Sequence, residues 1–382
     1  METFLEIQHK AKRLEALINL SNNILEKEKR IPVPFNDFLY LAATNPQLVF
    51  RDIFQLFHDM VHYYVPDGTD DNFEDSEHIG FIDYDTSKLF QDDVDAPFFA
   101  DRLFANRIMN MTHDFKKGAQ NNRIYIFEGP PGSGKSTFLN NILQKFEEYS
   151  KLPAGVSFKT YWRLDIDELG GFQSKEMQKY KLAEEHFKEH SQSAAESLLN
   201  LPEKYLEFSC PNHDHPILQI PKVYRKQFLD ELIPDKKFKE HLFNDKEYEW
   251  VLKSVPCSIC SSISRALLER IGDPLKVYSM LSARRNYFNR QLGEGISVFN
   301  PGDPLNNEVL SKPALQFMIN DLLKNDEVRY AFSYLAKTNN GILALMDIKE
   351  VNIERLKAFH GIISDGVHKV ELTEEYVKTL FI

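Results

Sequence analysis

The residues with the clearest chemistry lie between Gly129 and Thr137, in the pattern G-x-x-x-x-G-K-S-T. An apolar, β-prone run that begins at Ile124 leads into this pattern, and a helix-prone run follows it. A glycine-rich loop between a strand and a helix is typical of a phosphate-binding P-loop. Its glycines let successive backbone N–H groups point at phosphate oxygens, and the helix adds its positive N-terminal end. The alternative interpretation is an ordinary Gly/Pro turn between a strand and a helix.

The pattern gives roles to individual side chains. Lys135 would reach the β- and γ-phosphates of ATP, and the Ser136 hydroxyl would sit on Mg²⁺. We therefore predict ATP and Mg²⁺ as cofactors. The predicted nucleotide-binding residues are Gly129, Pro130, Pro131, Gly132, Ser133, Gly134, Lys135, Ser136 and Thr137.

A P-loop ATPase also needs an acid at the tip of a neighbouring strand, which holds Mg²⁺ through its water shell, and often a Glu that polarises the attacking water. One segment offers Asp347 and Glu350, and another offers Asp167 and Glu168. A central parallel strand should be continuously apolar because both of its faces are covered. The run 342–346 meets this condition, whereas the strand before Asp167 carries charged residues. We assign Asp347 to Mg²⁺ and Glu350 to the water; alternatively, Glu350 only begins a solvated helix.

The three cysteines of the chain form two half-sites. Cys210 and His213 make a C-x-x-H pair, and Cys257 and Cys260 make a C-x-x-C pair. Each pair can span one edge of a tetrahedral Zn²⁺ ion, and four protein ligands leave no open position, so we predict a structural zinc. His215 is an alternative fourth ligand. The competing interpretation is three buried reduced cysteines and a surface histidine.

Three other residues have simpler explanations than catalysis. Arg284 and Arg285 could act on a nucleotide in a neighbouring subunit, but surface charges are the favoured interpretation. Asp303 lies in a turn that its Pro and Gly neighbours explain.

Periodicity predicts an α/β fold in which helices flank a parallel sheet. Helical patterns cover residues 4–18, 35–64, 97–117, 168–207 and 310–338, and strand patterns cover 156–164, 341–346 and 376–382. The predicted units are a helical N-terminal region (1–66), an acidic linker (67–97), the first part of a P-loop core (98–167), an insertion with the zinc site (168–302) and the second part of the core (303–382).

The composition of the chain disfavours some classes of function. The 382 residues carry a formal charge of −11, which disfavours a general nucleic-acid binder because phosphate contact needs clustered Lys and Arg. No apolar run approaches the roughly 20 residues of a membrane span. The low, odd cysteine count fits a reducing cytosol, so we expect a cytoplasmic protein with neither nucleic acid nor membrane as a partner.

With these motifs placed, the chain resembles the N-terminal AAA+ module of the PrkA-type serine protein kinases. The resemblance includes the P-loop, both cysteine-containing pairs and the stretch from Asn340 to Glu350, where an acid also stands three residues before a Glu. Further similar segments begin at Phe57 and at Gly293. The family usually has Glu at the position of Asp347. Lys349 and the missing Arg before Gly341 are further departures. In that family, the strand matching 377–382 continues into a sensor residue, a lid and a kinase-related domain, so we expect this chain alone to bind ATP and to hydrolyse it slowly.

The resemblance implies an ATP–Mg²⁺-binding AAA+ module that couples ATP binding or hydrolysis to signalling by protein phosphorylation. It also implies a protein substrate and leaves room for a homo-oligomer formed through the AAA+ core. The alternatives are an AAA+ remodelling or proteolytic motor and an ATP-binding regulatory module without hydrolysis. A nucleic-acid-dependent ATPase is disfavoured by the net charge.

Overall fold

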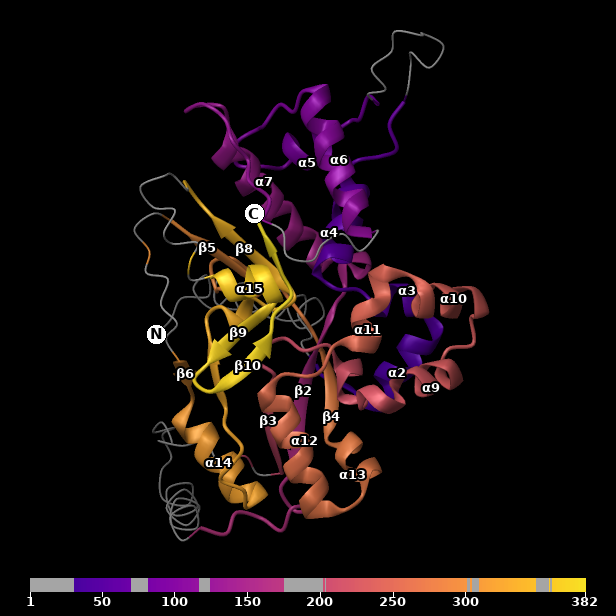
Figure 1. Cartoon of the computed structure of the whole chain (residues 1–382), viewed down its shortest axis with the longest axis vertical. Coiled ribbons are helices and arrows are strands. Elements are labelled where there is room, and N and C mark those ends of the chain that lie inside the picture. Colours follow the sequence, from indigo (N-terminus) through magenta and orange to yellow (C-terminus); the bar gives the residue numbers. More distant parts are fainter. Residues whose placement is uncertain are drawn as a thin grey trace, which may run out of the picture.

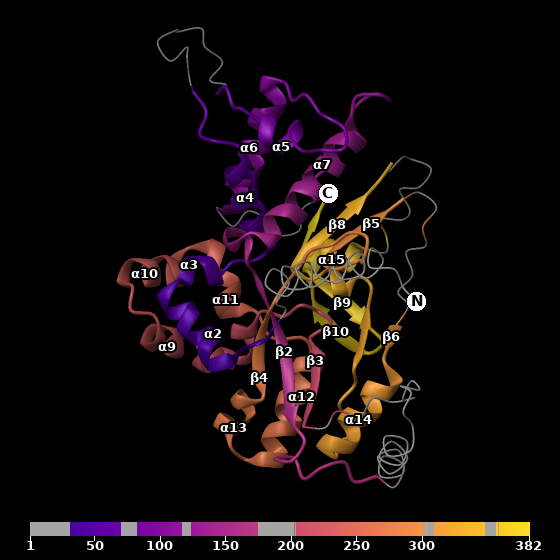
Figure 2. The same ribbon diagram turned by 180° about the vertical axis from the view of Figure 1, so that it is seen from behind.

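A computed structural model describes residues 31–69, 82–116, 124–174, 202, 204–300, 303, 309–347, 357 and 359–382. The protein is a mixed α/β structure with a parallel sheet, as predicted. Figures 1 and 2 show an antiparallel sheet and the parallel sheet, with helices packed around both.

The described strands are β1 (Val33–Pro34), β2 (Phe158–Asp165), β3 (Tyr205–Ser209), β4 (Leu281–Arg285), β5 (Ile296–Phe299), β6 (Val309–Ser311), β7 (Ala331–Ser333), β8 (Gly341–Leu345), β9 (Val367–Val370), β10 (Thr373–Tyr376) and β11 (Thr379–Phe381). The described helices are α2 (Phe35–Thr44), α3 (Pro46–Val49), α4 (Ile53–Tyr64), α5 (Ser87–Phe90), α6 (Arg102–Lys116), α7 (Lys135–Lys151), α9 (Lys222–Leu232), α10 (Lys236–Asn244), α11 (Glu249–Lys253), α12 (Ser258–Ile271), α13 (Pro274–Ser279), α14 (Pro313–Leu323) and α15 (His360–Asp365).

The parallel sheet has the order β11-β8-β5. Residues Gly341 to Ala344 of β8 are buried, which matches the apolar run that predicted this central strand. The segment that leads into the glycine-rich loop contacts this sheet without forming the predicted strand: Ile124 makes an isolated parallel bridge with Phe381, and the Tyr125 N–H donates to the Phe381 carbonyl at 3.2 Å. The predicted strands at 341–346 and 376–382 are therefore confirmed as β8 and β11, with β11 shorter than expected.

Helices α4 to α7 cover the parallel sheet and share a core with it. Helix α7 buries Phe138, Ile142, Phe146 and Tyr149, which recur at helical spacing. Helix α4 begins with a capping box in which Asp52 and Gln55 satisfy each other's backbone N–H groups. These helices form the support for the loop between Gly129 and Gly134.

The antiparallel sheet has the order β1-β4-β2-β3, and α2, α9 and α12 belong to its core. The predicted strand at 156–164 is confirmed as β2. Strands in the range 168–302 pair with strands outside it: β4 pairs with β1 and β2, and β5 pairs with β8. Residues predicted as an insertion thus contribute to both sheets.

Several predicted helices differ from the structure. The range 35–64 is divided into three helices, since Asn45 precedes Pro46 and leaves the helical conformation. The range 310–338 contains α14 but also β6 and β7, which pair with each other on either side of that helix. Strand β3 begins at Tyr205, within the predicted helix 168–207. The predicted helix at 4–18 and residues 175–201 lie outside the described residues.

The predicted acidic linker is partly structured. Residues 70–81 lie outside the described residues, but α5 follows them, and its Leu89 and Phe90 side chains are fully buried in the core shared by α4 and α7. Burial of the Leu89 and Phe90 side chains therefore stabilises this segment against the core, although acidic residues surround it in the sequence. No single helix in the described ranges is long and apolar enough to cross a membrane, although the stretches Lys246–Lys253 and Ser258–Ile271, bent by 41°, reach that length and composition together.

Candidate phosphate-binding loop and metal centre

The glycine-rich loop stands at the N-terminus of α7 and is open to solvent. Residues 128–133 are exposed. Gly132 and Gly134 have φ values of 79° and 81°, a left-handed conformation that side chains with a Cβ rarely adopt. Gly134 is also the residue that precedes the first turn of α7, whose backbone N–H groups have no partner inside the helix. Loop and helix together offer N–H groups and a positive helix end to an anion.

Lys135 lies across this loop. Its Nζ donates to the carbonyl oxygens of Gly129 and Pro130 at 2.7 and 2.8 Å and lies 3.3 Å from the Ser133 hydroxyl. These carbonyl oxygens hold the ammonium group above the loop backbone. Ser136 and Thr137 occupy the first turn of α7. The predicted nucleotide-binding residues thus lie in the loop and in the first turn of α7.

Asp347 follows β8 at its carboxyl end. Because the segment that begins at Ile124 and strands β11 and β8 run parallel, their carboxyl ends meet at one edge of the sheet. Asp347 and the glycine-rich loop leave the sheet at this edge, with β11 between them. Asp347 has a φ of 49°, which ends the strand. The second predicted acid, Glu350, lies outside the described residues.

The competing acids belong to the other sheet. Asp167 and Glu168 follow β2, and their backbone N–H groups donate to the Asp165 carboxylate at 3.0 and 3.1 Å. The Glu168 carboxylate forms an ion pair with Lys276. These contacts explain both residues as parts of a turn after an antiparallel strand.

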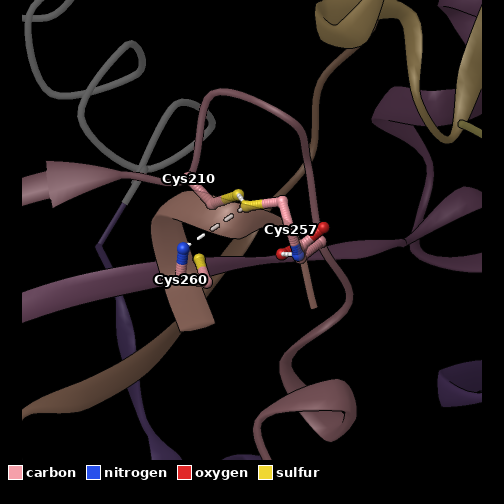
Figure 3. A group of neighbouring side chains, drawn as sticks. Cys210, Cys257 and Cys260 are labelled. Carbon is pink, nitrogen blue, oxygen red and sulfur yellow. Dashed lines mark hydrogen bonds between the residues drawn. The ribbon is translucent and has the colours of Figure 1, made fainter. Parts of the chain in front are cut away.

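The three cysteines converge on one buried point (Figure 3). Cys210 comes from the loop after β3, and Cys257 and Cys260 come from the start of α12. The sulfur atoms of Cys210 and Cys257 are 3.6 Å apart, far beyond the disulfide bond length of about 2 Å. Two thiolates on a tetrahedral Zn²⁺ at about 2.3 Å would have sulfurs about 3.8 Å apart. The sulfur spacing therefore suits a shared metal ion.

Asp214, rather than His213, completes this group. The ligand atoms of the three cysteines and Asp214 all lie within 4.8 Å of one another, and all four residues are buried. His213 adopts a left-handed conformation with φ 51°, and its buried Nδ1 has no hydrogen-bond partner. The structure thus groups Asp214, the residue after His213, with the three cysteines, whereas the predicted ligand His213 lies outside this group. This Cys₃Asp group could hold a metal ion.

His215, the alternative fourth ligand, has another role. Its Nε2 lies 3.0 Å from the Val49 carbonyl oxygen, and its Nδ1 accepts the Ile217 N–H at 3.3 Å. The ring packs edge-on against Phe38 and Trp250. His215 is therefore a buried packing residue that begins the short 3₁₀ helix Pro216–Gln219.

Burial governs the electrostatics of the Cys₃Asp group. Burial raises the pKa of Cys257, Cys260 and Asp214 well above their usual values. Burial also acts to raise the pKa of Cys210, but hydrogen bonds from Cys257 and Cys260 outweigh it and lower that pKa well below its usual range. A negative charge on a buried thiol or carboxyl group costs free energy unless a cation neutralises it.

Hydrogen bonds around the group hold its ligands in place. The Cys257 N–H donates to Asp214 Oδ2 at 2.7 Å, and the Trp162 indole N–H donates to the Cys260 sulfur at 3.4 Å. Glu375 of β10 accepts hydrogen bonds from the backbone and hydroxyl of Ser258. Bonds of this kind orient metal ligands. Neither Asp214 nor Trp162 has a spacing that the sequence pattern could single out.

The loop from Cys210 to Asp214 also contacts the parallel sheet. The Asn339 side chain donates to the Asn212 carbonyl at 2.7 Å, and the Asn340 side chain donates to the His213 carbonyl at 3.3 Å. Both asparagines immediately precede β8. The cysteine centre and the strand that leads to Asp347 are therefore directly connected.

The arginines and Asp303 have structural contacts. Arg285 donates to the Ser150 and Leu152 carbonyls at 2.7 Å, at the C-terminal end of α7, where a cation is favourable. Arg284 lies over the Tyr161 ring. The Asp303 carboxylate accepts the Asn300 N–H at 2.7 Å and closes the turn after β5.

Comparison with protein-family models, curated proteins and solved structures found no match to this chain.

Proposed function

We propose that this protein binds ATP and Mg²⁺ through a P-loop of the AAA+ kind, and that a structural zinc ion stabilises the fold beside it. The observation that carries the proposal is the exposed glycine-rich loop at the start of α7, with Lys135 lying across its carbonyl oxygens. Phosphate oxygens would replace these carbonyls as partners of the ammonium group, and the backbone N–H groups of the loop would bind the same phosphates.

The strand arrangement supports a magnesium site. The loop and Asp347 leave the parallel sheet at the same edge, where ligands of open α/β sheets bind. Ser136 would contact Mg²⁺ from the loop side, and Asp347 would order its water shell from the β8 side. The acids after β2 belong to the antiparallel sheet, which favours Asp347 over Asp167 for this role.

The zinc proposal rests on the donor set. Three thiols and a carboxylate are four protein donors, so the ion would have no open position and would be structural. Because Asn339 and Asn340 bind the loop that supplies Cys210 and Asp214, the ion would also fix the strand that leads to Asp347.

The resemblance to the PrkA-type kinases extends the proposal to signalling by protein phosphorylation. Its support is the set of sequence motifs, and it requires a protein substrate. Incorporation of labelled phosphate into a candidate substrate, lost in Lys135→Ala, would support this extension.

Nucleotide binding itself is tested with Lys135→Ala. Removing the charge aimed at the phosphates should cost about 1.5–3 kcal/mol, which is roughly a ten- to hundredfold loss of ATP affinity. Calorimetric titration with ATP and Mg²⁺ measures this loss. The matched control is Lys151→Ala, which removes an exposed lysine at the opposite end of α7 and should leave the affinity unchanged. Equal ATP affinity in the two variants would refute the nucleotide site.

A further inference from the structure

Three histidines outside the sites described above gather between α4 and α6. His58 and His62 come from α4, and His113 comes from α6. We propose that His58, His62 and His113 form a second metal site, distinct from the cysteine centre, for a divalent transition metal of the Zn²⁺ type. The proposal is independent of nucleotide binding.

The helical spacing brings the three rings together. His58 and His62 are four residues apart and therefore lie on one face of α4, the spacing that zinc-binding helices use. Their ring centroids are 4.2 Å apart, and those of His62 and His113 are 5.1 Å apart. One nitrogen from each ring lies within 4.8 Å of the other two. Zinc–nitrogen bonds of about 2.0–2.1 Å place tetrahedral ligands about 3.3 Å apart, so small rotations of the side chains suffice.

An unpartnered nitrogen provides independent evidence for a ligand. The Nε2 atom of His62 is buried and has no hydrogen-bond partner. A buried polar atom without a partner is costly, and in native proteins it calls for an explanation such as a bound ion. A metal ion among the three rings would satisfy this atom.

A chain of hydrogen bonds orients His58 in the way typical of metal-binding histidines. Its Nδ1 lies 3.1 Å from Asp59 Oδ1, which leaves Nε2 for a metal. The other Asp59 oxygen accepts from Arg51 Nη1 at 2.8 Å. Arg51 is in turn fixed by bonds to the Ala154 and Val156 carbonyls at 2.9 and 2.7 Å. Asp59 is therefore a positioning residue for this site.

The site faces solvent on one side. His58 is buried, His62 is half-buried and His113 is exposed, so a metal ion has a path to the rings. Three imidazole ligands leave one coordination position for water or another donor. Imidazole nitrogens suit Zn²⁺, Cu²⁺ and Ni²⁺.

The alternative is that the three rings are ordinary packing between α4 and α6. A metal site and a packing cluster differ in stoichiometry and in spectroscopy, so zinc binding to the metal-free full chain separates them. The wild type should bind two Zn²⁺ ions by calorimetry. His113→Gln should bind one, because Gln supplies no imidazole, and its exposed position keeps the fold intact, as circular dichroism will check. His62→Gln should also bind one.

Two further variants sharpen the experiment. Asp59→Asn should retain both ions but bind the second about 10–100-fold more weakly, as expected when an orienting carboxylate is lost. His360→Gln, an exposed histidine at the start of α15, should behave as the wild type. Substitution with Co²⁺ gives an independent readout, because thiolate coordination produces charge-transfer absorption that a three-histidine site lacks.

The outcomes decide the proposal in either direction. A second equivalent of metal that lacks thiolate absorption and disappears in His113→Gln and His62→Gln establishes the site. A single equivalent in the wild type that gives thiolate absorption, or metal binding that is unchanged in both variants, overturns it.

Discussion

The indole N–H of Trp162 donates a hydrogen bond to the sulfur of Cys260 across 3.4 Å. This bond joins the middle of β2 to the first turn of α12, in a position where both side chains are fully buried. A donor aimed at a thiolate stabilises its negative charge, so the antiparallel sheet takes part in the electrostatics of the cysteine centre. The link also explains why this tryptophan faces the core between strand and helix.

Trp162→Phe should therefore weaken zinc binding while keeping the apolar ring. We expect a loss of about 10–100-fold in affinity, the usual effect of removing a partner of a metal ligand. Competition with a chromophoric chelator measures this loss. The matched control is Trp250→Phe, which removes an indole hydrogen bond to Gln55 at 3.3 Å and should leave zinc affinity unchanged. Equal affinities in both variants would show that the bond to Cys260 does not tune the metal.

The cysteine spacing predicts most of the metal centre but not its fourth donor. C-x-x-C pairs converge by local geometry, so Cys257 and Cys260 could be paired from the sequence alone. The donor beside Cys210 depends on the turn that follows it, in which His213 takes a left-handed conformation. Bonds from Thr160, Asn339 and Asn340 hold that turn. Such long-range contacts are invisible in the spacing of two residues.

A pair of variants decides between the two donors. Asp214→Asn should lose most zinc binding, because a neutral amide is a poor zinc ligand, although its oxygen can still accept the Cys257 N–H. His213→Gln should retain one zinc ion at the cysteine centre. Elemental analysis after dialysis against a weak chelator gives the stoichiometry. Loss of zinc in His213→Gln with retention in Asp214→Asn would restore the C-x-x-H assignment.

The fold could be predicted where burial on both faces leaves an unbroken apolar run. Strand β8 is such a case, because its residues are covered by helices on one side and by other chain segments on the other. The pair β6 and β7 could not be predicted, since each strand is short and its partner lies beyond α14. Strand β3 likewise depends on pairing with β2, which a helical pattern of charges does not reveal. Tertiary pairing overrides local propensity at such places.

The position of Asp347 at the edge of the parallel sheet predicts that its carboxylate contributes to Mg²⁺ binding. Asp347→Asn should weaken Mg²⁺-dependent ATP binding by roughly tenfold, about 1.4 kcal/mol, because an amide orders the water shell of the metal poorly. Asp167→Asn should have little effect, since Asp167 follows a strand of the antiparallel sheet. Calorimetric titrations with and without Mg²⁺ isolate the metal-dependent part. The reverse result would move the magnesium-side acid to the end of β2.

The buried ring of His215 should make the stability of the protein depend on pH. Burial lowers the pKa of His215 from 6.5 to about 3, so the folded protein keeps the ring neutral where the unfolded chain protonates it. The stability that depends on the neutral ring is fully present above pH 6.5 and is lost as the pH falls toward 3. The slope is at most about 1.4 kcal/mol per pH unit for one proton.

His215→Gln removes this titration, so its free energy of unfolding should fall less steeply between pH 6.5 and 5 than that of the wild type, as urea titrations at each pH would measure. The control is the exposed His241, whose pKa is raised by its hydrogen bond to Asp245. Its contribution has the opposite sign, because it is present below pH 6.5 and is lost as the pH rises, so His241→Gln should leave the slope between pH 6.5 and 5 close to that of the wild type. Identical slopes in the wild type and His215→Gln would mean that His215 is protonated in the folded protein or is not buried as the structure has it.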